Sequence, residues 1–167
     1  MMDQQLHELA RRVGEALTAR GLMLATAESC TGGGVGEAVT AIAGSSGWYE
    51  RGFVTYTYIS KREMLGVRPE TLERHGAVSE QTVREMAAGA LAASHAQVAV
   101  AVSGTAGPAG GTPDKPVGTV CFGWAVKNGE PRVETRHFSG DREAVRRQSV
   151  ARALAGILEL LEDGSHS

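Results

Sequence analysis

Residues 22–36 read Leu22-Met23-Leu24-Ala25-Thr26-Ala27-Glu28-Ser29-Cys30-Thr31-Gly32-Gly33-Gly34-Val35-Gly36, an apolar run followed by a glycine-rich turn. Apolar side chains then recur at helical spacing through Ile42, so the pattern predicts a strand over 22–27, a sharp turn and a helix over 35–43. The first N–H groups of that helix lack partners inside it, and the helix dipole adds partial positive charge at the same end. Glycines let a ligand approach this backbone closely.

Two chemical uses fit this turn. A hydroxyl or thiol within it would lie beside backbone donors for an oxyanion, as acyl transfer requires. The same donors would also bind a phosphate without any chemistry. Ser29 and Cys30 are the two candidate nucleophiles. Ser29 also fits the role of a helix cap, and Cys30 that of a small buried apolar residue, which is the commonest fate of a free cysteine.

The composition predicts an ordinary globular domain. The chain has 167 residues, which we interpret as a single domain over 1–167 with room for a proper core. Its net charge is −2, and charges of both signs are spread along it, which argues against a nucleic-acid face or a membrane-binding patch. The apolar runs are too short to span a bilayer, and the polar start of the chain is unlike a signal peptide. We therefore expect a cytoplasmic protein.

The cysteines and glycines further limit the kinds of site that the chain can form. The two cysteines, Cys30 and Cys121, are too few for a disulfide scaffold, and no Cys-x-x-Cys or His-x-x-x-His pair indicates a structural metal site. We expect no metal. Of the 22 glycines, 14 are concentrated at 32–36, 44–52, 104–111 and 118–129. Because these clusters follow apolar runs, they favour backbone that a ligand approaches.

The remaining pattern predicts an alternation of helices and strands. The predicted elements, in order, are a helix over 4–19 ending near Gly21, the strand over 22–27, the helix over 35–43, a loop over 44–47, a strand over 51–58, short helices over 60–65 and 69–75, a helix capped by Ser79, a strand over 97–103, a loop over 104–117, strands over 118–126 and 132–138 joined at Asn128-Gly129, and a helix from Asp141 to about 162 before a frayed tail.

This order predicts an α/β fold, a three-layer α/β/α sandwich with a mostly parallel central sheet and an antiparallel edge hairpin. The valine- and alanine-rich strand over 97–103 reads as buried on both faces and is expected at the centre. Ligands of such sheets bind at the carboxyl ends of strands. Three loops fall there, 28–34, 58–61 and 103–116, and their convergence is the predicted site.

A serine nucleophile needs a base, and no histidine is well placed in the pattern. Lys61 can serve if it is neutral. Its reference pKa of about 10.4 leaves roughly one lysine in 2,500 neutral at pH 7, so burial or a nearby cation must lower it. The alternative is a solvated surface lysine.

Other residues near these loops suit binding. Backbone donors at Gly104, Thr105, Gly110 and Gly111, with Lys115, can form a cradle for a phosphate or sugar, although the pattern is not a P-loop. Arg142 opens the last helix, where an anion is favoured, whereas we expect Arg146 and Arg147 on a solvated face. Glu28 is either a surface charge or a carboxylate that orients a base, and Thr31 a cap or a ligand contact.

Several motifs occur together, in order: Ala27-Glu28-Ser29-Cys30-Thr31-Gly32-Gly33, Gly44-Ser45-Ser46, Arg51-Gly52-Phe53-Val54-Thr55-Tyr56, Lys61, His75-Gly76-Ala77-Val78-Ser79, Val102-Ser103-Gly104-Thr105-Ala106-Gly107-Pro108, Gly110-Gly111-Thr112-Pro113-Asp114-Lys115-Pro116-Val117-Gly118 and Gly140-Asp141-Arg142. Over nearly its whole length the chain thus resembles the C-terminal domain family of competence/damage-inducible protein CinA. It looks like the stand-alone form, without the molybdopterin-binding-like module of longer members.

The resemblance implies hydrolysis of the carboxamide of nicotinamide mononucleotide to nicotinate mononucleotide and ammonia, in pyridine-nucleotide (NAD) salvage, with no cofactor. The family's Ser–Lys pair falls on Ser29 and Lys61. The predicted substrate-binding residues are Glu28, Thr31, Gly32, Gly33, Tyr56, Thr105, Gly110, Gly111 and Arg142. The chain departs from many relatives at Tyr56-Thr57-Tyr58, where they have Tyr-Ser-Asn, and at Thr105, where they have Ile.

Two other readings stay open. One uses Cys30 as the nucleophile with Glu28 and Lys61, the residue types of nitrilase-like amidases. The other is a non-catalytic nucleotide sensor that uses the glycine loops only to bind. The partner expected in each case is a small nucleotide, and we also expect a homo-oligomer such as a dimer, because Trp48, Tyr49 and Phe53 could be exposed near the site.

Overall fold

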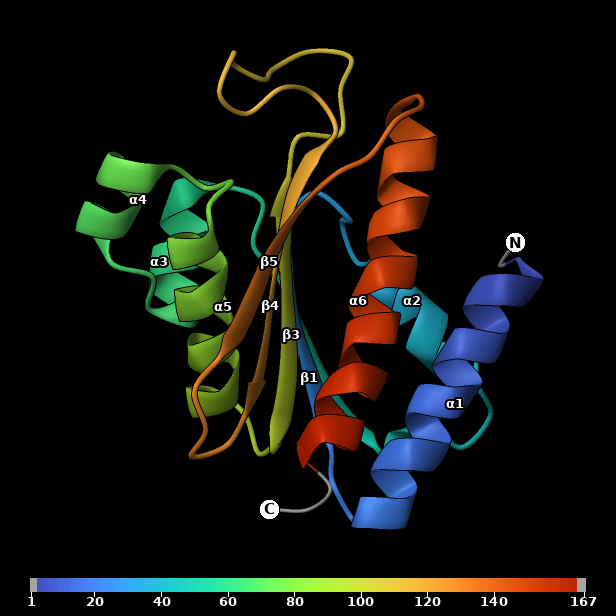
Figure 1. The fold of residues 1–167 in the computed structure, drawn as a ribbon. Helices are drawn as coiled ribbons and strands as arrows, with labels where there is room; N and C mark the ends of the chain where they lie inside the picture. The colour runs from blue at the N-terminus through green and yellow to red at the C-terminus, as the bar shows by residue number, and fades with distance from the viewer. Residues whose placement is uncertain (1–2, 165–167) are drawn as a thin grey trace.

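The computed structural model describes residues 3–164 and has three layers, with a sheet between two sets of helices (Figure 1). The elements in chain order are α1 (Gln4–Arg20), β1 (Leu24–Glu28), α2 (Gly34–Thr40), the 3₁₀ helix η1 (Ser45–Gly47), β2 (Tyr49–Val54), α3 (Tyr58–Leu65), α4 (Pro69–His75), α5 (Glu80–Ala92), β3 (Val98–Gly104), β4 (Thr119–Val126), β5 (Arg132–His137) and α6 (Arg142–Gly164). Helices α1, α2 and α6 cover one face of the sheet, and α3, α4 and α5 lie on the other.

The sheet has the strand order β2-β1-β3-β4-β5. Strand β1 pairs in parallel with both β2 and β3, while β4 is antiparallel to β3 and to β5. The predicted three-layer α/β/α fold is therefore confirmed, with the valine-rich strand β3 at the centre and the hairpin β4–β5 at one edge. Asn128 in that hairpin's turn has φ 68°, a conformation that asparagine tolerates.

Alternating side-chain size in β3 sets how closely the helices approach. Its valines, Val98, Val100 and Val102, face the core beneath α1, α2 and α6, whereas Ala99 and Ala101 face α5. Small residues on the α5 side let that helix approach the sheet closely. A Cβ added at Gly123 of β4 would lie 2.6 Å from the carbonyl oxygen of Val83 on α5.

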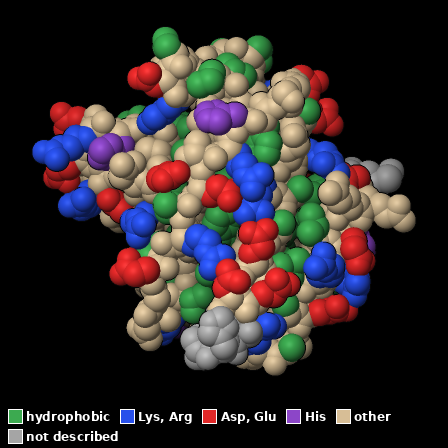
Figure 2. Space-filling model, viewed as in Figure 1, with side chains coloured by type: hydrophobic (Ala, Val, Ile, Leu, Met, Phe, Trp, Pro, Cys, Tyr) green, Lys and Arg blue, Asp and Glu red, His purple; other side chains and the backbone are tan. Residues whose placement is uncertain are grey.

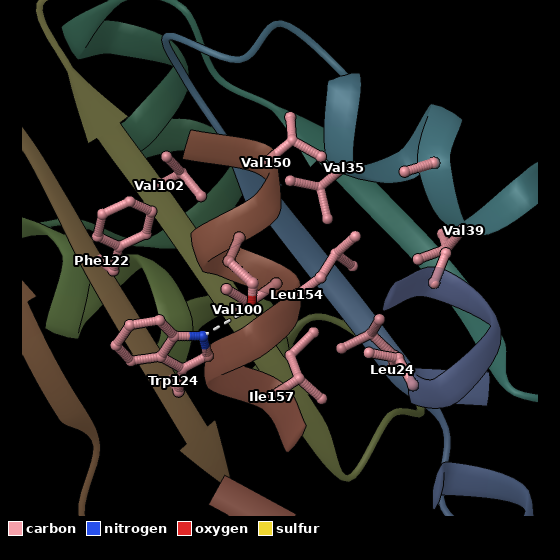
Figure 3. Close-up of a cluster of buried hydrophobic side chains, with 14 of the residues drawn as sticks. Leu24, Val35, Val39, Val100, Val102, Phe122, Trp124, Val150, Leu154 and Ile157 are labelled. Carbon is pink, nitrogen blue, oxygen red and sulfur yellow. Dashed lines mark hydrogen bonds between the residues drawn. The ribbon is translucent and has the colours of Figure 1, made fainter. Parts of the chain in front are cut away.

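The larger core lies on the α6 side (Figure 3). Trp124 is fully buried there, stacks on Phe122 with ring centroids 5.6 Å apart, and donates a hydrogen bond from its indole nitrogen to the carbonyl of Ala153, 3.0 Å away. This pairing satisfies the one polar atom of the side chain. Trp48 is also buried in this core, so the expectation that it is exposed is wrong.

Strand β2 ends at Val54, earlier than the predicted strand over 51–58. The cause is a capping box at the start of α3: the hydroxyl of Thr57 accepts a hydrogen bond from Ser60 N–H, and the Ser60 hydroxyl accepts one from Thr57 N–H. These contacts overcome the β propensity of residues 55–58, so Tyr58 opens the helix. The predicted loop over 44–47 likewise contains η1.

The last helix is longer than predicted. Asp141 caps it by accepting a hydrogen bond from Ala144 N–H, and α6 continues to Gly164. Residues 163 and 164, predicted as part of a frayed tail, are thus helical, and 165–167 lie outside the described residues.

Within 3–164 the helices are all too short or too polar to cross a membrane. Basic and acidic side chains are interspersed on the face that Figure 2 shows.

Because β1, β2 and β3 are parallel, their carboxyl ends meet at one edge of the sheet. The connections that leave this edge are 29–33, 55–57 and 105–118, and the first residues of α6 lie at the same end of the molecule (Figure 1). This is the edge where the predicted site falls.

Candidate active site

Ser29 and Lys61, 32 residues apart in the chain, lie within hydrogen-bond distance. Ser29 follows β1 and Lys61 is on the first turns of α3, and 2.9 Å separates its Nζ atom from the Ser29 Oγ atom. Lys61 is 1% exposed, so the reading of a solvated surface lysine is wrong. Its amine also donates to the carbonyl of Thr55, 2.8 Å away, which holds the amine toward Ser29.

The surroundings of Lys61 favour its neutral form. Burial lowers the pKa of the amine from 10.5 to about 8. About one-tenth of the molecules then carry a neutral amine at pH 7, against roughly one in 2,500 for a free lysine. Among residues 3–164 no carboxylate forms an ion pair with Lys61, and the effect of burial on its pKa exceeds the opposing effect of the nearby Cys30 thiol. The amine is therefore suited to accept a proton from the serine.

Cys30 is placed differently. Its side chain belongs to the hydrophobic core on the α6 side, and burial, with a smaller contribution from the Glu28 carboxylate, raises the pKa of its thiol to about 12. A thiol in this environment stays protonated near neutral pH and is a poor nucleophile. The geometry therefore favours Ser29 over Cys30.

Glu28 lies beneath the turn rather than at the surface. It is 2% exposed, and its Oε1 atom accepts hydrogen bonds from the Thr31 hydroxyl at 2.6 Å and from Val35 N–H at 2.9 Å. Its Oε2 atom accepts one from Gly36 N–H at 2.9 Å. The carboxylate thus caps α2 and occupies N–H groups that sequence reasoning left free for a ligand.

The turn itself is held by short-range bonds. Gly32 N–H donates to the carbonyl of Ser29 at 3.0 Å, and Gly34 N–H donates to that of Thr31 at 2.9 Å. Gly32 and Gly33 have φ of 59° and 105°, conformations that side chains rarely adopt, which explains the glycines here.

Arg146 is a residue whose contacts sequence reasoning missed. It reaches across from α6 and donates from Nε to the carbonyl of Cys30 and from Nη2 to that of Thr31, each at 3.2 Å. Its side chain is exposed, as expected, but its guanidinium contacts the turn. A helical periodicity places this arginine on the surface and says nothing of a turn that is 115 residues away.

A cavity of about 260 Å³ opens beside the Ser29–Lys61 pair. Five of the predicted site residues border it: Ser29, Tyr56, Lys61, Thr105 and Arg142. The wall also includes Cys30 beside Ser29. The residues that complete it from β3 and its loop are Ser103, Gly104, Ala106, Gly107 and Ala109, and those on the α5 side of the sheet are Tyr58, Ala77 and Val78. No histidine of the described residues borders this cavity.

The other predicted substrate-binding residues lie elsewhere. Thr31, Gly32 and Gly33 border a second cavity, of about 350 Å³, on the side of the turn where Arg146 lies. Gly110 and Gly111 border neither cavity. Lys115 donates to the carbonyl of His75, at the end of α4.

Arg142 joins two walls of the first cavity. Its guanidinium donates to the carbonyl of Gly107 at 2.8 Å and to the hydroxyl of Tyr56 at 3.0 Å. The hydroxyl of Tyr58 accepts a hydrogen bond from Ala77 N–H at 3.3 Å. Both tyrosines are more than half exposed, so their rings offer a surface to a ligand in the cavity.

Within residues 3–164, no three His, Cys, Asp or Glu side chains are grouped to hold a metal ion.

Comparison with known proteins gives consistent matches. The CinA C-terminal domain matches residues 6–161. The chain is 58% identical to nicotinamide-nucleotide amidohydrolase PncC of Escherichia coli (strain K12), over 92% of this chain and 93% of that protein. It is 53% identical to the protein of the same name from Pseudomonas putida, over 91% and 94% of the two chains. The crystal structure of competence/damage inducible protein CihA from Agrobacterium tumefaciens superposes with a TM-score of 0.93 at 48% identity, over 96% and 98% of the two chains.

Proposed function

Because the chain belongs to the CinA C-terminal domain family, we propose that it hydrolyses the carboxamide of nicotinamide mononucleotide to nicotinate mononucleotide and ammonia, in pyridine-nucleotide salvage. The identity to proteins named nicotinamide-nucleotide amidohydrolase, over most of both chains, supports an amidohydrolase. The observation that carries the mechanism is the buried amine of Lys61, 2.9 Å from the Ser29 hydroxyl.

The proposed reaction has two stages. The neutral amine of Lys61 takes the proton of Ser29 as its Oγ atom forms a bond to the amide carbon. The resulting tetrahedral intermediate then breaks its C–N bond, and the Lys61 ammonium gives the proton to the departing nitrogen, which leaves as ammonia. A water molecule next attacks the acyl-serine ester and gives a proton to Lys61. The bond between the acyl carbon and Oγ breaks, Lys61 returns the proton to Ser29, and the carboxylic acid is released. Thr55 contributes through its carbonyl, which keeps the amine aligned throughout.

The oxyanion of the intermediate needs donors beside Ser29. The N–H groups of Gly32, Gly34, Val35 and Gly36 already donate within the turn or to Glu28. The donors that we propose are therefore backbone amides nearer to Ser29, beginning with that of Cys30, which borders the cavity. Loss of one such donor typically lowers the rate by about 10²–10³-fold.

The rest of the cavity suits a nucleotide. Arg142 supplies a positive charge at its wall, which would attract the phosphate, and the loop over 104–109 supplies backbone and the Thr105 hydroxyl for the sugar. The rings of Tyr56 and Tyr58 would lie against the pyridinium ring, whose positive charge favours an aromatic neighbour.

Ammonia release from nicotinamide mononucleotide tests the proposal directly. The wild-type protein is expected to release ammonia and a new carboxylic acid in equal amounts, and Ser29→Ala is expected to release neither above background. A protein that is stabilised against heat by the nucleotide but releases no ammonia would instead be a sensor. Activity retained in Ser29→Ala and lost in Cys30→Ala would move the nucleophile to the thiol.

A further inference from the structure

We propose that Arg146 of α6 is a positioning residue that orients the amides of Cys30 and Thr31 as the oxyanion hole of Ser29. The proposal rests on the function proposed above, because it assumes that Ser29 attacks a carbonyl. It concerns a residue outside the first cavity, which Ser29 and Lys61 border. Arg146 borders the second cavity, on the other side of the turn.

The first step of the argument is the geometry of the peptide unit. In a trans peptide the carbonyl of one residue and the N–H of the next point in opposite directions. Arg146 Nε holds the carbonyl of Cys30 at 3.2 Å, so the N–H of Thr31 points away from Arg146. The arginine thereby sets the direction of an amide that it does not touch.

The contact of Arg146 with the carbonyl of Thr31 acts on Cys30 through one further hydrogen bond. Arg146 Nη2 holds the carbonyl of Thr31, so the N–H of Gly32 points away from the arginine. That N–H donates to the carbonyl of Ser29 at 3.0 Å. The carbonyl of Ser29 is thereby held, and the N–H of Cys30, in the same peptide, points the opposite way.

Glu28 holds the other end of the turn. It accepts the Thr31 hydroxyl and the N–H groups of Val35 and Gly36, so the turn is held by an anion at the start of α2 and by a cation at its carbonyls. The four glycine residues among 32–36 leave the backbone little stiffness of its own. Two charged side chains therefore supply the rigidity that a preorganised oxyanion hole requires.

The neighbouring arginine provides a matched control. Arg147 carries the same charge on the same helix and borders the same second cavity, but it bonds to Asp3 and Gln5 of the N-terminal segment. Arg146→Met and Arg147→Met thus remove the same group from adjacent positions, and only the first releases the turn.

The experiment compares these two variants with Arg146→Lys in ammonia release at saturating and limiting nicotinamide mononucleotide. Because the donors are loosened rather than removed, we expect Arg146→Met to lower kcat about 10-fold with KM within about 2-fold. Arg146→Lys keeps one donor and should recover part of kcat, and Arg147→Met should stay within about 2-fold of wild type in both constants. Equal kcat in Arg146→Met and Arg147→Met, both folded by circular dichroism, would overturn the proposal.

A second readout does not depend on the substrate. A fluorophosphonate bonds its phosphorus to an activated serine and loses fluoride, and its phosphoryl oxygen uses the same oxyanion donors. Labelling of Ser29, located by mass spectrometry, should slow about 10-fold in Arg146→Met and remain unchanged in Arg147→Met. If the wild type labels at Ser29 in this pattern but releases no ammonia, the inference holds and the proposed substrate is wrong. Equal labelling of the two variants would reject the inference whatever the substrate.

Discussion

Ser29 and Cys30 are adjacent in the chain and both border the first cavity, yet their side chains contact two different regions. The Ser29 hydroxyl meets the amine of Lys61, whereas the Cys30 side chain packs against the core on the α6 side. One physical cause, burial, acts on the titratable group in each region. It lowers the pKa of the Lys61 amine to about 8 and raises that of the Cys30 thiol to about 12.

The comparison shows that burial has opposite chemical consequences for bases and acids. Both groups are driven to their neutral forms. For an amine the neutral form is the one that accepts a proton, so burial activates it. For a thiol the neutral form is the poor nucleophile, so burial lowers its reactivity. The assignment of Ser29 as the proposed nucleophile therefore depends on which neighbour each side chain meets.

The largest expected effect comes from removing either member of the pair. Ser29→Ala and Lys61→Met should each lower kcat at least about 10³-fold, because nucleophile and base act as one unit. Lys61→Arg should be equally inactive, since a guanidinium keeps its proton at any accessible pH. Ammonia release under single-turnover conditions measures all three. Turnover near that of wild type in Lys61→Arg would show that position 61 contributes only charge.

The pH profile should follow the buried amine. Only neutral Lys61 accepts the serine proton, so kcat/KM should rise about tenfold per pH unit below its pKa of about 8 and level off above it. Between pH 6 and pH 8 this amounts to roughly 50-fold. Initial rates at constant ionic strength measure the profile, and Cys30→Ala should reproduce it. A flat profile between pH 6 and 9 would contradict a lysine base.

The same pKa makes a prediction about stability. Lys61 has a pKa of about 8 in the folded protein and about 10.5 when unfolded, so the unfolded chain binds more protons between these values. The penalty of burying the ammonium, at most about 3 kcal/mol, is full below pH 8 and disappears as the pH rises to about 10.5. Relative to Lys61→Met, the free energy of unfolding of the wild type should therefore increase across this window.

Urea unfolding of both proteins at pH 7, 8 and 10 measures that difference. Serine-to-alanine substitution at position 29 serves as the control, because it removes the hydroxyl but leaves the amine buried. If the stability of the wild type relative to Lys61→Met does not change between pH 8 and 10, the amine is not neutral in the folded state.

The smallest expected effect comes from removing the thiol of Cys30. Cys30→Ala should change kcat by less than about 3-fold, because the thiol is protonated and packed in the core. Iodoacetamide at pH 7.5 should leave the activity intact, and the loss of one small buried group should lower the free energy of unfolding by about 1 kcal/mol. Rapid inactivation on modification of Cys30 alone would bring the thiol back as the nucleophile.

Much of this arrangement could be predicted from local patterns. The continuous run of valine and alanine indicates β3 as a strand buried on both faces, and the strand–glycine–helix signal identifies the turn after β1. Because parallel strands end at the same edge, the pattern also predicts that the loops after β1, β2 and β3 converge. Ser29 and Lys61 lie together where these loops converge, as the pattern leads us to expect. Their catalytic roles stay predictions.

Other features depend on contacts that no local pattern records. Glu28 looks like a charge beside a surface turn, but its side chain turns inward to three donors. Arg146 lies on the exposed face of a helix and still holds two carbonyls of a distant turn. Likewise, the capping box at Thr57 and Ser60 decides where β2 ends, although residues 55–58 have the composition of a strand.

The amino-acid order alone determined the alternation of strands and helices, the glycine turn and the nature of the reactive groups, because these follow from the periodicity and chemistry of neighbouring residues. Only the tertiary structure decided that the Lys61 amine is buried against Ser29 while the Cys30 thiol faces the core. Burial is a sum over side chains brought together from the whole chain, and it sets which protonation state each group favours. The protonation states favoured at this turn are therefore a property of the folded molecule.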